Sequence, residues 1–219
     1  MPTKSTNYDC SFVPRRTSLC LWGVFLSLFT GNASAVTIDE RMTSDHRTWN
    51  AIFELRKEAQ EIVIELRIRL IADASVPPQQ LRKVTARWHA GVAKIWGEVA
   101  SLESDGQTYP IRINVRFVDH NAHHHAIVHP NANTRIDQLN WSIWSEHLVI
   151  AHEVGHMLGA YDEYAGGSLD PDNPLITNDS IMSGQLYPRV FPRHLELIRL
   201  WAEKAIGPSK INIIQQVTD

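Results

Sequence analysis

The stretch "HEVGHMLGAYD", from His152 to Asp162, restricts the fold more than any other part of the chain. Residues four apart lie on one face of an α-helix, so His152 and His156 can present two ring nitrogens to one metal ion if this segment is helical. Neutral imidazole suits Zn²⁺, and a catalytic zinc site needs three protein ligands and an open position. Glu153 follows the first histidine and is the natural general base. Gly159 can adopt a left-handed turn that folds the chain back, which makes Asp162 the third ligand.

Alternatives remain at this motif. Glu163 is adjacent to Asp162 and could complete the metal shell instead, or could orient a ligating histidine through a hydrogen bond. The histidines could also be solvated residues of an ordinary amphipathic helix. The glutamate after the first histidine argues against a purely structural zinc site, because such a site needs no base and usually fills its fourth position with protein.

The first 35 residues have the layout of a secretory signal peptide. Two arginines, Arg15 and Arg16, precede an uncharged apolar stretch from Leu19 to Phe29, and small residues at 33–35 offer a cleavage site. This apolar stretch is much shorter than the roughly 20 residues that span a bilayer. We therefore expect a secreted or periplasmic protein with no stable membrane span after cleavage.

Composition limits which partners and which metal ligands can be expected. The chain has 219 residues and a net charge of -3, which fits one soluble globular domain, and the absence of a basic cluster argues against nucleic acid. Both cysteines, Cys10 and Cys20, precede the expected cleavage, so the mature protein would have no disulfide and no thiolate ligand. Histidine is unusually frequent, with 11 copies.

Apolar spacing between Asp45 and Ala72 predicts a helix, because apolar residues recur there at intervals of three, four and seven. We therefore expect a helical extension over residues 36–78, followed by a catalytic domain over residues 79–219. The extension could be a prosegment or a partner-binding arm, although a helix packed on the domain is the simpler expectation.

Residues 79–219 contain both helical and strand patterns, and we expect an α+β fold. The expected elements are a helix from Leu81 to Val99, an alternating strand from Ile111 to Phe117, a short edge strand from Ala126 to Pro130, the metal helix from Ser142 or Ser145 to Gly159, a loop over residues 165–180, and a last helix from Pro192 to Gly207.

A second motif lies downstream, where "NDSIMSGQ" places Met182 in a tight polar turn. A helix with the pattern HExxHxxGxxD followed by a methionine turn resembles the metzincin zinc peptidases, and in particular their aspartate-liganded, snapalysin-like branch. The residues that carry the resemblance are His152, Glu153, His156, Gly159, Asp162 and Met182.

The resemblance implies a zincin fold, with a twisted mixed sheet, an active-site helix and a Met-turn. It implies that His152, His156 and Asp162 bind Zn²⁺, that Glu153 is the base and that Met182 forms a hydrophobic floor. It favours Asp162 over Glu163, because Asp162 holds the family position.

The implied activity is zinc-dependent endopeptidase action on a peptide or protein. We expect an extended substrate to pair with the edge strand at Ala126–His129. The alternatives are a non-catalytic binding module stabilised by zinc and an effector peptidase that acts on another organism's proteins.

Other candidates carry weaker signals. The histidine-rich stretch from His120 to His129 could be a second metal site or part of the substrate cleft, but a solvated loop leading into the edge strand is favoured. Tyr164 and Tyr187 could donate hydrogen bonds to an oxyanion, and a half-buried position is the simpler expectation for each. The acidic stretch at residues 170–179 lacks the spacing of a recognised calcium loop. The pattern does not assign His194.

Overall fold

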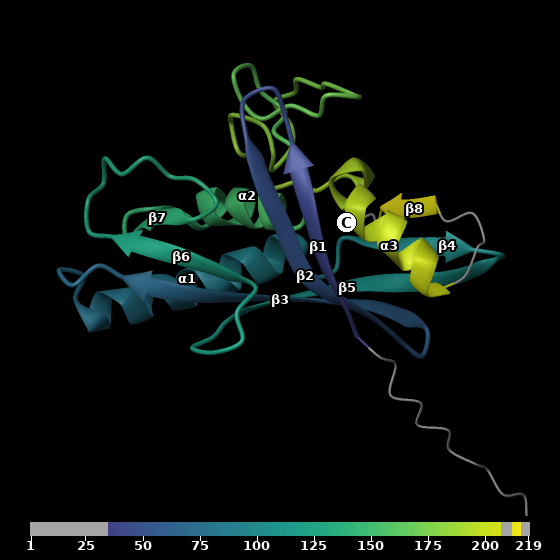
Figure 1. Ribbon diagram of the computed structural model, residues 1–219, viewed down its shortest axis with the longest axis horizontal. Helices are drawn as coiled ribbons and strands as arrows, with labels where there is room; N and C mark the ends of the chain where they lie inside the picture. The colour runs from purple at the N-terminus through teal and green to yellow at the C-terminus, as the bar shows by residue number, and fades with distance from the viewer. Residues whose placement is uncertain (1–34, 207–211, 216–219) are drawn as a thin grey trace, which may run out of the picture. The chain divides into compact units, whose positions relative to one another are not determined.

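The computed structural model describes residues 35–206 and 212–215, which form an α+β fold with a mixed sheet and three α-helices (Figure 1). The expected signal peptide falls outside these ranges except for residue 35, as does Gly207. None of the described helices combines the length and hydropathy needed to cross a bilayer. In chain order the elements are β1 (Val36–Thr43), β2 (Thr48–Glu58), β3 (Glu61–Ala72), α1 (Pro78–Trp96), β4 (Ala100–Ser104), β5 (Gln107–Phe117), β6 (His124–His129), β7 (Asn140–Ser142), α2 (His147–Met157), the 3₁₀ turn η1 (Pro192–Leu195), α3 (Glu196–Ile206) and β8 (Asn212–Gln215).

The sheet is built around β3. Its strands follow the order β1-β2-β3-β5-β4-β8, while β6 pairs with β3 and β7 pairs with β6. β3 is antiparallel to β2 and parallel to both β5 and β6. Residues 62–66 of β3 are buried on both faces, as expected for a central strand covered on each side.

Two strands share one edge of β3. β2 pairs with Glu61–Glu65, and β6 pairs with Ile68–Ala72 farther along. The Ile68 carbonyl accepts the N–H of Val118, just after β5, whereas the Arg67 carbonyl accepts the N–H of His123, so β5 and β6 lie on opposite sides of β3. β2 therefore leaves β3 where β6 begins, and Figure 1 shows the two strands diverging from that point.

The helix expected over Asp45–Ala72 is wrong, because this segment forms the hairpin of β2 and β3. In β2 the side chains of Ala51, Phe53 and Leu55 are buried while their neighbours are half-buried or exposed, which is a period of two. Apolar residues at alternate positions in β2, and at most positions in β3, also occur at spacings of three, four and seven. The helical pattern was therefore a by-product of strand periodicity.

The turn of this hairpin carries no sequence signal. Ala59 takes a positive φ of 47° between the two strands, a conformation that glycine and asparagine adopt far more readily. Both strands belong to the sheet that also contains β5 and β6, so the segment forms part of the sheet instead of a helical extension.

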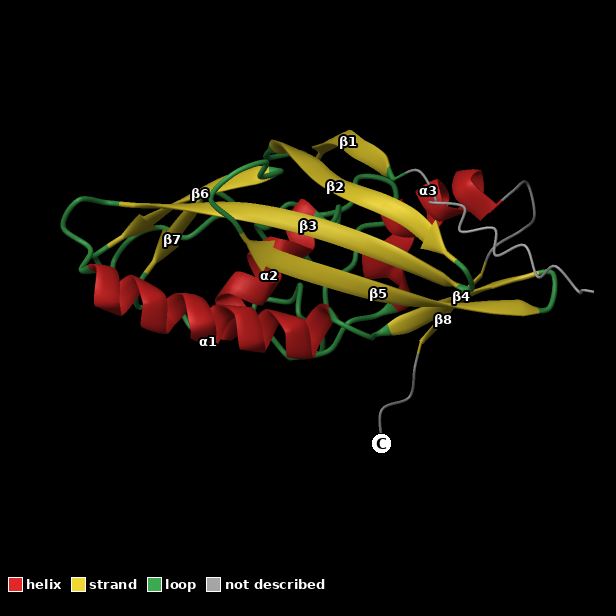
Figure 2. Ribbon diagram, turned by 90° about the horizontal axis from the view of Figure 1, so that it is seen from below, coloured by secondary structure: helices red, strands yellow, loops and turns green. Residues whose placement is uncertain are grey.

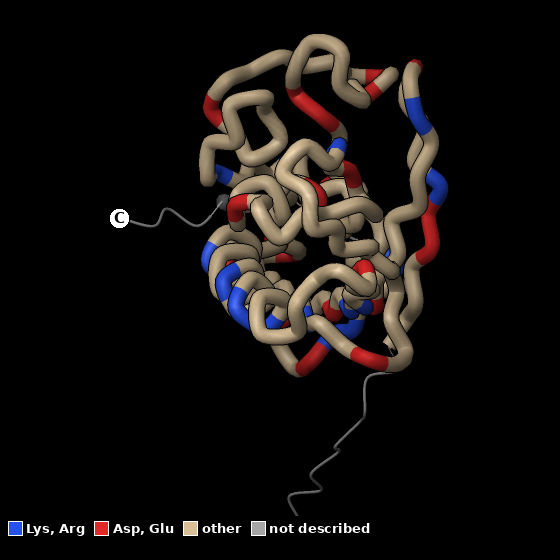
Figure 3. Tube along the Cα trace, turned by 90° about the vertical axis from the view of Figure 1, so that its left-hand side faces the viewer, with Lys and Arg blue, Asp and Glu red and all other residues tan. Residues whose placement is uncertain are grey.

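The second expected helix is confirmed as α1, which lies along one face of the sheet (Figure 2). Its tryptophans hold α2 in place: Trp88 Nε1 donates to the Ser145 carbonyl at 2.9 Å, and Trp96 Nε1 donates to the Ala151 carbonyl at 2.8 Å. The outer face of α1 carries several basic residues and no acidic one (Figure 3). Trp96 thus fixes α2 against α1, and Trp88 holds the residues just before α2.

Several element boundaries differ from the expected ones. Pro78 begins α1, because proline is well accommodated in the first turn of a helix. α1 ends before Gly97, and the turn at residues 104–106 instead joins β4 to β5. Ser142 belongs to β7, so α2 begins only at His147. The alternating strand is confirmed as β5, and the last helix begins as the η1 turn and continues as α3.

Candidate metal centre

Helix α2 places His152 and His156 on one face, with ring centroids 4.9 Å apart. His152 Nδ1 lies 3.0 Å from the Ile181 carbonyl, and His156 Nδ1 lies 2.9 Å from the Ala160 carbonyl. A carbonyl can only accept, so each Nδ1 carries the hydrogen and each Nε2 keeps a free lone pair. Both rings therefore present the nitrogen that a metal ion would bind.

The chain then turns back as the glycine predicts. Gly159 has a φ of +94°, and Asp162 returns to the two histidines. Asp162 Oδ1 lies 3.1 Å from His152 Nε2 and 3.3 Å from His156 Nε2. The other oxygen, Oδ2, accepts the N–H of Ser168 at 2.6 Å, which fixes the carboxylate.

The donor set of this group fits a metal ion. Asp162 Oδ1 is buried and has no hydrogen-bond partner within the described part of the chain. One nitrogen from each histidine and one carboxylate oxygen lie within 4.8 Å of one another, so three acceptors converge with no donor between them. A buried arrangement of this kind could hold a metal ion, and two imidazoles with one carboxylate suit Zn²⁺.

The Glu153 carboxylate lies beside this group and has no structural partner. Its residue is 7% exposed, and no donor within the described ranges binds its side chain. Burial raises the pKa of Glu153 above its usual value, although the nearby histidines oppose the shift. Because no side chain or backbone donor of the described residues engages this carboxylate, it is left open to water or to a ligand.

Glu163, the alternative ligand, is turned away to a different set of partners. Its carboxylate accepts hydrogen bonds from Ser180 Oγ, from Arg193 Nη2 at 3.0 Å and from His194 Nε2 at 3.0 Å. Burial alone would raise the pKa of Glu163, but these donors outweigh it and lower that pKa to about 2. The structure therefore brings Asp162, and not Glu163, to the histidines. It also gives His194, which the sequence left unassigned, a buried place beside Glu163.

Met182 lies directly against the metal helix. A Cβ atom on Gly155 would be only 2.5 Å from Met182 Sδ, so the thioether fills the space that this glycine leaves between the two histidines. The Met182 carbonyl accepts the N–H of Glu163 at 2.9 Å. The downstream turn that the sequence pattern indicates is thus joined to the loop that carries Asp162.

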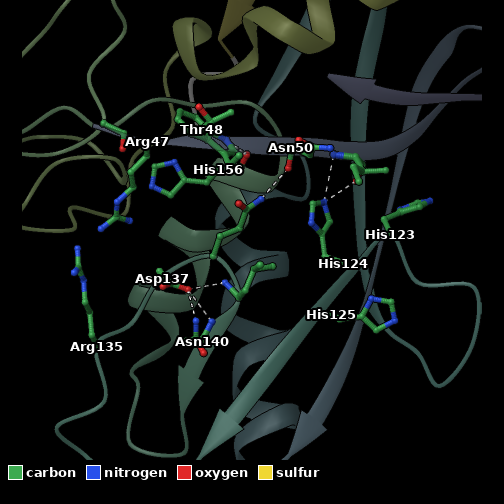
Figure 4. Close-up of a pocket in the computed structure, with 15 residues that line it drawn as sticks. Arg47, Thr48, Asn50, His123, His124, His125, Arg135, Asp137, Asn140 and His156 are labelled. Carbon is green, nitrogen blue, oxygen red and sulfur yellow. Dashed lines mark hydrogen bonds between the residues drawn. The ribbon is translucent and has the colours of Figure 1, made fainter. Parts of the chain in front are cut away.

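A cavity of about 720 Å³ opens beside His156 (Figure 4). Its walls come from the first residues of β2, from the start of β6 and from the loop before β7. Gln138 Nε2 donates to the Asn50 carbonyl at 3.0 Å and joins that loop to β2. Trp49 of β2 reaches α2, because its Nε1 donates to the His156 carbonyl at 2.9 Å. The cavity therefore occupies the wedge where β2 and β6 diverge.

The solvated loop favoured for the histidine-rich stretch is only partly correct, because residues 120–123 form a loop but His124–His129 form β6. His123, His124 and His125 line the cavity, and His124 is 5% exposed, with Nε2 3.0 Å from the Ile52 carbonyl. The alternation of buried His124, Ala126 and Val128 is a strand signal that could have placed these histidines. No second cluster of three potential ligand side chains occurs here or at residues 170–179 within the described ranges.

The prediction that a substrate pairs with a free edge at Ala126–His129 is also wrong. Ile127–His129 of β6 pair with Asn140–Ser142 of β7, so that edge is already occupied. Of the two tyrosines, Tyr164 lies beside the site, with its ring centroid 6.3 Å from that of His152. Burial, together with the charges of Asp162 and Glu153, raises the pKa of Tyr164 to about 12 and keeps it protonated. Tyr187 is 55% exposed.

No family model matches the chain, and comparisons with the curated proteins and with the solved structures gave no match either. The geometry of the site is therefore the basis for inferring a function.

Proposed function

We propose that this chain is an exported, zincin-type zinc endopeptidase in which His152, His156 and Asp162 hold Zn²⁺ and Glu153 is the general base. The three converging acceptor atoms and the uncompensated Asp162 Oδ1 support the metal assignment. The methionine packed beneath the helix supports the zincin assignment, and the layout of residues 1–35 supports export.

The observation that carries the proposal is the contrast between two buried glutamates. The Glu163 carboxylate accepts hydrogen bonds from Ser180, Arg193 and His194, as is expected of a carboxylate with a structural role. Glu153 is influenced by the charges of His152, His156 and Asp162 but has no hydrogen-bond donor within the described ranges, so its carboxylate is free to contact a substrate or water. A metal that only stabilised the fold would need no unpaired carboxylate beside it.

The chain's own residues supply the remaining chemistry. Bound Zn²⁺ would polarise the scissile carbonyl and lower the pKa of a water molecule. Glu153 takes a proton at one Oε oxygen and delivers it to the leaving amine. The carbonyls of Ile181 and Ala160 keep the two histidine rings oriented throughout, because they hold the hydrogen on each Nδ1.

The test is Glu153→Gln, measured for zinc content and for cleavage of a mixed peptide library. We expect stoichiometric zinc and loss of hydrolysis, because glutamine keeps the size of the side chain but cannot take the proton. Glu146→Gln is the matched control, since Glu146 precedes the same helix and is exposed. Unchanged turnover in Glu153→Gln would refute the mechanism. A wild-type protein that binds zinc but cleaves nothing would favour the zinc-stabilised binding module.

A further inference from the structure

Two arginines face the cavity beside the metal centre. Arg47 lies in the turn that precedes β2, and Arg135 lies in the loop that precedes β7. Figure 4 shows the side chains of Arg47 and Arg135 extending toward each other on one side of the cavity. Two segments far apart in the sequence thus bring positive charge to one place.

Neither guanidinium group is used by the fold. Within the described ranges no hydrogen bond or ion pair involves the side chain of Arg47 or Arg135. Asp137 also lines the cavity, but its Oδ1 accepts from Leu139 N, Asn140 N and Asn140 Nδ2, each at 2.9 Å. The aspartate is therefore engaged by its own loop, and the arginines remain available to a ligand.

The backbone of both arginine-bearing segments is held in place. The Arg47 carbonyl accepts the N–H of Ser44 at 2.8 Å, and Ser44 Oγ accepts the N–H of Arg47 at 3.2 Å. The loop that carries Arg135 is bound to β2 through Gln138 and Asn50. A ligand would thus meet two cations on positioned supports, which reduces the entropy lost on binding.

The local charge differs from that of the whole protein. Two arginines and one aspartate line the cavity, whereas the chain carries a net charge of -3. The planar guanidinium group matches a carboxylate with two parallel hydrogen bonds. Apolar side chains of Trp49, Ile52 and Leu139 line the same cavity and suit the remainder of a peptide.

We infer that the cleft selects peptides through a carboxylate bound by Arg47 and Arg135, which makes acid-bearing peptides the preferred substrate class. This inference rests on the proposed peptidase function. The carboxylate is either an Asp or Glu side chain near the scissile bond or the carboxyl terminus of the peptide. The two sources place the same group against the same arginines, and they can be separated by experiment.

The cleavage test uses quenched peptides that differ at one position between Glu and Gln, each with a free or an amidated carboxyl terminus. One comparison is between Glu and Gln, and the other is between a free and an amidated carboxyl terminus. In the comparison that alters the recognised carboxylate, we expect kcat/KM to be about tenfold higher for the peptide that has the carboxylate. Arg47→Gln, Arg135→Gln and the double variant should remove that preference, whereas Arg82→Gln on the exposed face of α1 should retain it. The wild-type preference should also weaken at high salt, which tests the inference without any substitution.

A binding test keeps this inference separate from the peptidase proposal. The same peptides, labelled for anisotropy, are titrated onto the Glu153→Gln protein, and onto this protein with both arginines replaced by glutamine. Preferential binding of carboxylate peptides that disappears when both arginines are replaced supports the inference. It does so even if the wild-type protein cleaves nothing, because absent cleavage would overturn only the peptidase function. Equal binding of acidic and amide peptides, or cleavage without preference, would overturn the inference and leave the peptidase function standing.

Discussion

His194 Nε2 lies 3.0 Å from Glu163 Oε1, and this contact joins the η1 turn to the residue that follows Asp162. Ser180 and Arg193 donate to the same carboxylate. The N–H of Glu163 is bound to the Met182 carbonyl. One buried carboxylate therefore locks together the loop that carries Asp162, the Met182 turn and the start of the last helix.

Glu163→Gln should loosen this junction. Glutamine keeps the size of the side chain but loses the charge that Arg193 and His194 face, so we expect the free energy of unfolding to fall by about 2 kcal/mol. Zinc affinity should fall by roughly 10-fold to 100-fold, because Asp162 is less firmly placed. Competition with a chelator and urea unfolding measure the two effects. Glu196→Gln, which alters an exposed pair with Arg199, is the control and should change neither; unaltered zinc affinity in Glu163→Gln would contradict the positioning role.

Asp162→Asn should separate metal binding from folding. The amide oxygen can still accept the N–H of Ser168, and the amide nitrogen can donate to the histidine nitrogens that converge on it. We therefore expect the metal-free protein to be at least as stable as the wild type, with zinc affinity reduced by about 100-fold or more. Thermal unfolding in chelator and calorimetric zinc titration test both parts, with exposed Asp172→Asn as the control. Wild-type zinc affinity in Asp162→Asn would remove this residue from the metal shell.

Gly155→Ala should destabilise the protein even though alanine favours helices. The new methyl group would lie 2.5 Å from Met182 Sδ and 3.1 Å from Trp96 Cζ2, in a region with no space to yield. We expect a loss of about 2 kcal/mol in the free energy of unfolding. In a Met182→Ala background the same substitution should cost less, because the clashing thioether is gone. A double-mutant cycle by urea unfolding measures this coupling, and additive effects would show that Met182 does not press on Gly155.

His124 should make the fold sensitive to acid. Burial lowers the pKa of His124 to about 4, against 6.5 for an ordinary histidine. The unfolded chain therefore takes up this proton at a higher pH than the folded chain does. Stability is unaffected by this group above about pH 6.5 and falls by roughly 3 kcal/mol as the pH drops toward 4. Urea unfolding across this range, with a chelator present so that metal release does not contribute, should show a shallower pH dependence in His124→Gln than in the wild type. Exposed His125→Gln should retain the wild-type dependence, and an unchanged slope in His124→Gln would show that this histidine is not buried in its neutral form.

The elements that were predicted correctly are those whose determinants are local. The stripe of α1 and the alternation of β5 are each contained within one element, and both appear where expected. The β2–β3 hairpin was missed because its turn uses Ala59 at positive φ, which carries no turn signal, and because the apolar residues of β3 have no polar face. A strand buried on both sides looks the same as a buried helix until its neighbours are known.

The residues of the candidate site also fall into those that local sequence spacing placed and those that distant segments placed. The spacing of His152, Glu153 and His156 was sufficient to place them, since a helix converts that spacing into one face. The convergence of Asp162, and the role of Glu163 as a structural partner, depended on Ser168, Ser180 and His194, which lie on other segments. The cleft arginines were missed, because nothing near either arginine in the sequence indicates that the two meet.

By itself the sequence determined the α+β class at the coarse level, the helix that carries His152 and His156 and the chemical character of its side chains, because a helical repeat and a left-handed glycine act over a few residues. The tertiary structure alone decided which carboxylate joins the histidines, which glutamate stays unpaired and where the cavity opens. The carboxylates are placed by Ser168, Ser180 and His194, and the cavity opens because β2 leaves β3 at the point where β6 begins; apart from the Ser168 contact, these are pairings between residues distant in the chain. Such pairings are selected by the burial of whole strands and not by any local pattern, so they become visible only when the folded chain is seen.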